Sequence, residues 1–135
     1  MKKDTKDFLE IAEDNLIIAK KNFEDKIYRS ACFWAQQAAE LFIKAYMVEK
    51  EIFDPKKHIT HDLFFLIKEC SKKDKDFEKL FDFERELAML SKFATTTRYV
   101  IKEIKRISEQ EAKEAIEIAE KVKEFVMNKL KEKLE

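Results

Sequence analysis

The chain contains no glycine in 135 residues, and its only proline is Pro55. Tight β-hairpins rely on glycine-containing turns such as Asn-Gly and Asp-Gly, so a sheet protein would lack its usual connections here. Hydrophobic residues account for 45% of the chain and charged residues for 41%, which argues against disorder. The composition therefore predicts an all-α fold.

The length of the chain fits a single domain. A chain of this size buries roughly two thirds of the surface that its unfolded form exposes, so it needs no disulfide or metal to fold. The sequence shows no internal repeat, low-complexity segment or linker. We expect one helical domain over residues 1–135.

The absence of glycine also excludes several kinds of active site. Phosphate-binding P-loops, dinucleotide-binding fingerprints and nucleophile elbows all use backbone positions that glycine fills. The formal net charge is +0, so no overall field attracts nucleic acid or an anionic membrane. Binding of either would have to come from a local patch.

The two cysteines, Cys32 and Cys70, lack CxxC spacing, which predicts reduced, buried thiols. The N-terminal residues lack the apolar core of a signal peptide, and no apolar run has membrane-spanning length. We expect a cytoplasmic protein that does not enter a membrane.

Apolar residues recur at intervals of three and four and so predict five helices. The predicted helices span residues 5–23, 27–49, 62–70, 77–97 and 108–130. Ser108 and Glu111 have the spacing of a capping box at the start of the last helix. Short connections favour antiparallel neighbours, so we expect an up-down bundle of four to five helices.

The helix predicted at 27–49 is apolar on almost every side, which is typical of a central helix. Gln37, Glu40 and Lys44 are polar exceptions on it, and the last two are four residues apart and share a face. His61 and Asp62 open the third predicted helix.

Arg98 and Tyr99 follow the fourth predicted helix. In an antiparallel bundle these residues can meet the polar residues of helix 27–49 and the entrance of the third helix at one end, where they would bind a ligand. The same residue types also fit a structural role. Glu40 and Lys44 would then form a surface ion pair worth about 0.5 kcal/mol. His61 would cap its helix, and Arg98 would neutralise a helix C-terminus.

The order of these motifs resembles one known family. Residues 34–45, WAQQAAELFIKA, resemble the QQAxE-x₃-K-A signature of HEPN domains, which are small nucleotide-associated bundle proteins of prokaryotes and higher eukaryotes. His61-Asp62-Leu63 resembles the family's HDL motif, and Arg98-Tyr99 resembles its RY pair. Ser108 fits the start of the final segment, so the resemblance covers nearly the whole chain.

The resemblance implies a helical bundle that commonly dimerises, and it implies one of two functions. One branch consists of metal-independent RNA endonucleases, whose motif is an Arg followed about a turn later by a His. The other branch lacks this pair and accompanies minimal nucleotidyltransferases as a partner chain, in modules of the toxin–antitoxin kind.

The nuclease motif is absent from this sequence. Its only histidines are His58 and His61, and no arginine precedes either of them at the required distance. We therefore expect a non-enzymatic, nucleotide-binding accessory protein that forms a homodimer and has a nucleotidyltransferase as partner. An RNA endonuclease with His61 and Arg98 joined through space is one alternative, and a purely structural interaction module is another.

Two further sites can be weighed from the residues alone. His58 and His61 could ligate a metal with Asp62 or Cys70, but no fourth ligand has a matching spacing, so we expect neither metal nor cofactor. The basic segment that follows Tyr99 could contact phosphate or RNA, although it also fits a solvated loop. Its candidate residues are Lys102, Lys105 and Arg106, together with Arg98.

Overall fold

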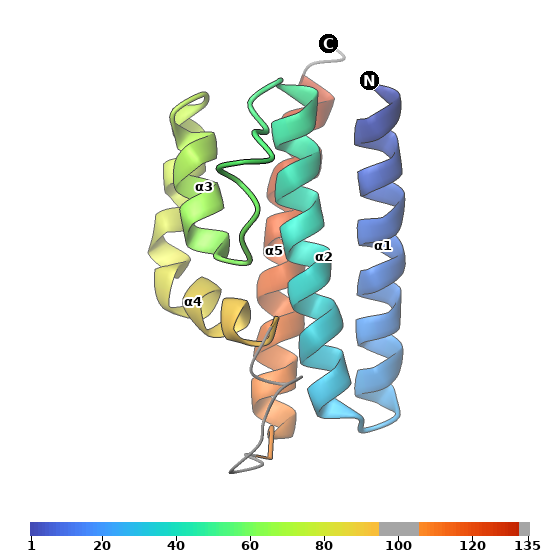
Figure 1. Ribbon diagram of the computed structural model, residues 1–135. Coiled ribbons are helices and arrows are strands. Elements are labelled where there is room, and N and C mark those ends of the chain that lie inside the picture. Colours follow the sequence, from blue (N-terminus) through green and yellow to red (C-terminus); the bar gives the residue numbers. More distant parts are fainter. Residues whose placement is uncertain (95–105, 133–135) are drawn as a thin grey trace.

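The computed structural model describes residues 1–94 and 106–132, which contain six helical segments and no strand (Figure 1). The segments are α1 (Lys3–Glu24), α2 (Tyr28–Glu49), α3 (Leu63–Ser71), the 3₁₀ helix η1 (Lys75–Phe83), α4 (Glu84–Lys92) and α5 (Glu109–Glu132). The predicted all-α bundle is confirmed. None of the described helices is long and apolar enough to cross a membrane.

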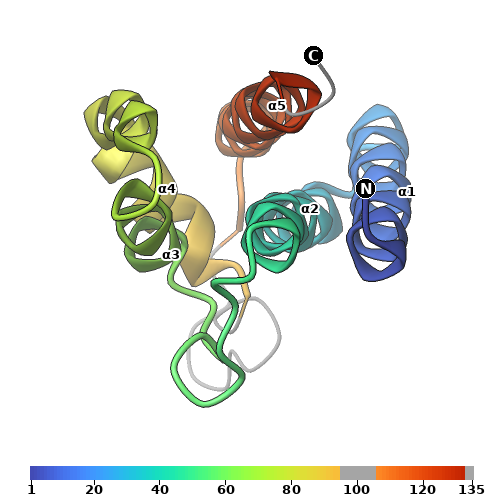
Figure 2. The ribbon, with the colours of Figure 1, turned by 90° about the horizontal axis from the view of Figure 1, so that it is seen from above.

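Helix α2 is the central helix, as its sequence predicted. It packs against both α1 and α5, and the shorter helices lie on its remaining side (Figure 2). Its alanines face these neighbours and are fully buried, which lets the helix backbones approach closely. They are Ala31, Ala35, Ala38, Ala39 and Ala45.

The antiparallel pair α1 and α2 is joined at one end by a buried carboxylate. Glu49, at the last turn of α2, is only 3% exposed. It accepts hydrogen bonds from the backbone N–H of Lys2 (3.0 Å) and from the hydroxyl of Thr5 (2.9 Å). A side chain of α2 thus satisfies a donor at the start of α1, where α1 itself supplies no side-chain cap.

Both α1 and α2 end in a turn that normally contains glycine. Lys26 and Glu51 have φ angles of 62° and 59°. The N–H of each bonds to the carbonyl three residues back, and the next N–H bonds to the carbonyl five residues back. This is the hydrogen-bond pattern of a Schellman motif, with a left-handed residue just past the helix end. Because the chain has no glycine, non-glycine residues adopt this conformation here.

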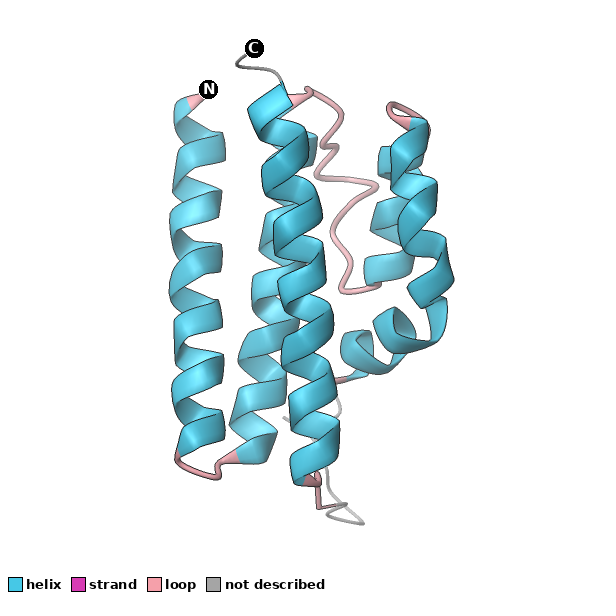
Figure 3. Cartoon of the chain, turned by 180° about the vertical axis from the view of Figure 1, so that it is seen from behind, coloured by secondary structure: helices cyan, strands magenta, loops and turns pink. Residues whose placement is uncertain are grey.

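The single long helix predicted for residues 77–97 is wrong. The chain forms η1 and then the short α4, which runs across the bundle (Figure 3). Phe77, Leu80 and Phe83 are three residues apart, a spacing that places them on one face of a helix with three residues per turn. Lys129 of α5 also binds Asp76 and so fixes the start of η1.

Two local predictions are confirmed: the capping box at the start of α5 and the burial of both cysteines. The N–H of Glu111 donates to the Ser108 hydroxyl (3.1 Å), and the N–H of Ser108 donates back to the Glu111 carboxylate (3.3 Å), which is the predicted capping box. Cys32 and Cys70 are free thiols with no exposed surface. Burial, with a smaller effect of Glu111, raises the pKa of Cys32 to about 12, and this thiol is therefore inert at neutral pH.

Candidate functional site

A polar cluster surrounds Glu40 in the middle of α2. Its carboxylate accepts hydrogen bonds from His61 Nδ1 (2.7 Å) and Gln36 Nε2 (3.0 Å) at Oε1, and from Lys44 Nζ (2.9 Å) at Oε2. Gln37 Nε2 extends the network by donating to the side-chain oxygen of Gln36 (2.6 Å). Helix α2 supplies four of these residues, because positions three and four apart lie on one face. The fifth, His61, comes from the entrance of α3.

The Glu40 carboxylate is held in its ionised form. Glu40 is only 6% exposed, and burial by itself would raise its pKa. The hydrogen bonds from His61, Lys44 and Gln36 outweigh burial, so the pKa of Glu40 lies below its usual value. An ionised carboxylate can only accept hydrogen bonds.

His61 joins this buried carboxylate to the surface. Since ionised Glu40 is an acceptor, Nδ1 of His61 must carry a proton. The His61 side chain is 53% exposed, and it borders an open pocket of about 360 Å³ whose wall also includes Thr60, Ser91 and Lys92. Its Nε2 is thus the ring nitrogen that a ligand can reach, as an acceptor in the neutral ring and as a donor in the cation.

The start of α3 is fixed by hydrogen bonds that set the position of His61. Asp62 accepts from the N–H of Phe65 (3.1 Å) and is therefore the N-cap of α3. The N–H of Asp62 donates to the Thr60 hydroxyl (3.1 Å), and that of Leu63 donates to the Ser91 hydroxyl of α4 (3.0 Å). Asp62 thus positions the helix entrance and points its carboxylate at the backbone.

The structure brings together part of the predicted site. Glu40, Lys44 and His61 meet, and Gln37 reaches Glu40 only through Gln36. The interpretation of Glu40 and Lys44 as a surface ion pair is wrong, because their side chains are only 8% and 12% exposed. Arg106 is exposed. Four other predicted residues lie outside the described part of the chain: Arg98, Tyr99, Lys102 and Lys105.

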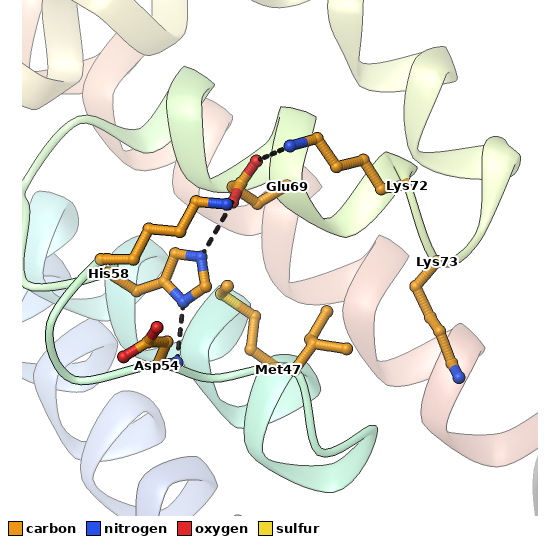
Figure 4. A pocket seen from close by; sticks show the side chains of 8 residues that line it. Met47, Asp54, His58, Glu69, Lys72 and Lys73 are labelled. Carbon is orange, nitrogen blue, oxygen red and sulfur yellow. Dashed lines mark hydrogen bonds and ion pairs between the residues drawn. The ribbon is translucent and has the colours of Figure 1, made fainter.

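A second polar cluster, which the sequence reasoning missed, lies between the loop of residues 50–62 and α3 (Figure 4). Its centre is Glu69 of α3, which is 8% exposed. The Glu69 carboxylate binds Lys72 Nζ (2.6 Å), Lys57 Nζ (2.9 Å) and His58 Nε2 (3.0 Å). These three donors lower the pKa of Glu69 to about 2. In the sequence, Glu69 lies between the apolar residues Ile67 and Cys70 of the same helix face. A carboxylate in that position could have indicated a buried polar cluster.

His58 in this cluster is a neutral imidazole with a defined tautomer. The backbone N–H of Asp54 donates to Nδ1 of His58 (2.8 Å), so Nδ1 carries no proton. Nε2 therefore carries the ring proton and donates it to Glu69. His58 is only 4% exposed, and its two hydrogen bonds make it a structural link between the loop and α3. Among residues 1–94 and 106–132, no three His, Cys, Asp or Glu side chains group to hold a metal.

These features define a class of protein: an all-helical bundle whose central helix carries an ionised glutamate bound by a lysine one turn on and by a histidine from the next helix. The chain belongs to the HEPN domain family, whose model matches residues 5–132.

Two solved structures share the fold. TT1696 from Thermus thermophilus is 27% identical, with a TM-score of 0.76 over 93% of this chain and 97% of that one. ST0689, an archaeal HEPN homologue, is 22% identical, with a TM-score of 0.69 over 96% and 98% of the two chains, and shows similarity of fold alone. No curated protein matches the chain.

Proposed function

We propose that this protein is a HEPN-type accessory protein that binds the phosphate group of a nucleotide through His61, positioned by Glu40 and Lys44. The half-exposed ring of His61, anchored at Nδ1 on a buried carboxylate, is the observation that carries the proposal. A ring held at one nitrogen presents the other in a fixed direction, so little conformational entropy is lost when a ligand binds.

The surroundings of His61 favour an anion as the ligand. The cation of His61 would donate Nε2–H to a phosphate oxygen, a hydrogen bond strengthened by charge. Lys92 and the hydroxyls of Thr60 and Ser91 lie in the same pocket wall. The Asp62 carboxylate is engaged with the N–H of Phe65, which reduces its repulsion of the ligand.

Calorimetric titration with ATP, GTP and nucleoside monophosphates tests this proposal. We expect saturable binding that weakens at least tenfold in His61→Ala and in Lys44→Met. The matched control is Lys79→Ala, which removes an exposed lysine of η1 with one weak ion pair at 4.0 Å, and it should stay within twofold of wild type. The absence of heat with every nucleotide, or equal losses in all three variants, would refute the proposal.

We also propose that the protein acts with a minimal nucleotidyltransferase as partner, in a module of the toxin–antitoxin kind and in the cytoplasm. The missing Arg-His nuclease pair in the sequence supports this choice over an RNA endonuclease. Co-expression with a nucleotidyltransferase encoded beside the gene should yield a complex that co-elutes in gel filtration. Separate elution of the two purified chains would argue against it.

A homodimer is the oligomeric state that we propose. Helix α1 leaves three isoleucines exposed: Ile11 at 52%, Ile17 at 63% and Ile18 at 38%. Ile11 and Ile18 are seven residues apart and therefore share a face of the helix, where a second copy of the chain would cover them. Sedimentation at micromolar concentration should show a species of twice 16.2 kDa. A monomer alone would contradict the proposal.

A further inference from the structure

A second pocket, of about 310 Å³, lies where the loop of residues 50–62 meets the C-terminal end of α3 (Figure 4). It shares no lining residue with the pocket beside His61. Its volume is at the lower end of the range of small-molecule sites, which is roughly 300–1,000 Å³. The pocket therefore has room for a small ligand.

Positive charge predominates in the wall of this pocket. Lys57, Lys72 and Lys73 contribute three ammonium groups, whereas Glu69 and Asp54 contribute two carboxylates. His58 adds no charge, because Asp54 N–H donates to its Nδ1 and fixes the neutral ring. The local field therefore favours an anion.

The lysines keep donor capacity for such an anion. Lys57 and Lys72 each donate to the buried Glu69 carboxylate, and an ammonium group has three N–H donors, so each retains others. Lys73 is exposed and makes no ion pair with any described residue. Glu69 thus draws two ammonium groups to one point, from the loop and from the end of α3. Lys73 lies in the same pocket wall, with its side chain directed away from Glu69 (Figure 4).

The remainder of the pocket is apolar. Met47 is fully buried and Ile52 is partly buried against the core. A site with a few positive donors beside an apolar surface is suited to a molecule that carries an anionic group on a less polar body. A phosphate has more acceptor oxygens than a carboxylate and is better matched to three separate ammonium groups.

We propose that this pocket is a second anion site, which binds the phosphate group of a small phosphorylated molecule. Lys57, Lys72 and Lys73 donate to the phosphate oxygens, and the partly buried Ile52 contacts the organic part. This site is independent of the nucleotide site proposed at His61. Free phosphate and the phosphate of an organic ester share the chemistry, and the experiment separates them.

Amide NMR titrations at low ionic strength, with inorganic phosphate and with adenosine 5′-monophosphate, test the proposal. The signals of Lys72 and Lys73 report this pocket, and those of Gln37 and Lys44 report the His61 site. We expect saturable shifts at Lys72 and Lys73 with both ligands, and binding at least fivefold tighter for the monophosphate than for phosphate. The shifts at Lys72 and Lys73 should persist in His61→Ala.

The decisive variant is Lys73→Ala, because this exposed side chain forms no ion pair with the described residues and its loss should leave the fold intact. It should weaken binding at this pocket at least fivefold. The control, Lys68→Ala, removes the same charge from an exposed position of α3, where Lys68 lies over the ring of Phe64, and should stay within twofold of wild type.

Several results would overturn the inference. Linear, non-saturable shifts, or equal weakening in Lys73→Ala and Lys68→Ala, would reduce the effect to diffuse surface charge. Equal affinity for phosphate and the monophosphate would refute the role of the apolar surface. Loss of the shifts at Lys72 and Lys73 in His61→Ala would refute an independent second site.

Discussion

The Nδ1 atom of His61 lies 2.7 Å from Oε1 of Glu40, so a carboxylate in the middle of α2 fixes a ring at the entrance of α3. The two residues differ sharply in environment: Glu40 is 6% exposed, whereas the His61 side chain is 53% exposed. This pair connects the buried hydrogen-bond network of α2 to the surface of the protein.

Removing the charge of Glu40 should destabilise the fold. In Glu40→Gln the side chain keeps its size but loses one acceptor oxygen, which leaves the largely buried Lys44 ammonium group without its partner. We expect the free energy of unfolding to fall by about 1–3 kcal/mol, measured by urea denaturation. Glu10→Gln, at an exposed position of α1, should change it by less than about 0.5 kcal/mol. Similar losses in both variants would contradict the role of Glu40.

The cap of α3 should contribute measurably to stability. Asp62→Ala removes the oxygen that accepts from the N–H of Phe65, and we expect a loss of about 1 kcal/mol. Asp62→Asn retains a capping oxygen and should recover most of that loss. Chemical denaturation of the two variants and of wild type checks this. If Asp62→Ala is as stable as wild type, the Asp62 cap does not contribute to stability.

The Glu69 cluster should weaken in acid. The folded-state pKa of about 2 is below the ordinary value of about 4.3 for an unfolded glutamate. The unfolded chain therefore binds more protons between these values, and the stabilisation is complete above about pH 4.3 and is lost as the pH falls towards 2. The gap in unfolding free energy between wild type and Glu69→Gln should narrow from about pH 7 to about pH 3. A difference in unfolding free energy that stays constant over this pH range would contradict the lowered pKa of Glu69.

A glycine at the end of α1 should stabilise the protein. Lys26 has a φ of 62°, a conformation that costs a non-glycine residue about 1–2 kcal/mol. Glycine removes this cost, but part of the stabilisation is lost because glycine is more flexible in the unfolded chain. Lys26→Gly should therefore raise the melting temperature, with a net gain of about 0.5–1 kcal/mol. Glu10→Gly, inside the same helix, should lower stability by about 1 kcal/mol. A destabilised Lys26→Gly variant would refute the expectation.

The sequence predicted the main helices well because their signals are local. Apolar residues on almost every side identified α2 as the central helix, and Ser108 with Glu111 marked the start of α5 within its first turn. The break between η1 and α4 was not predicted, because the spacings of Leu80, Phe83 and Leu87 also fit one continuous helix. The contact of Lys129 with the start of η1 comes from a distant part of the chain.

For the candidate site, the sequence alone determined which residues share a face of α2, because Glu40 and Lys44 lie one helical turn apart. Only the tertiary structure decided that His61 reaches Glu40, and that Glu69 gathers Lys57, His58 and Lys72. Such contacts depend on the path of the loop of residues 50–62 and on the helix packing, which long-range burial sets rather than local propensity.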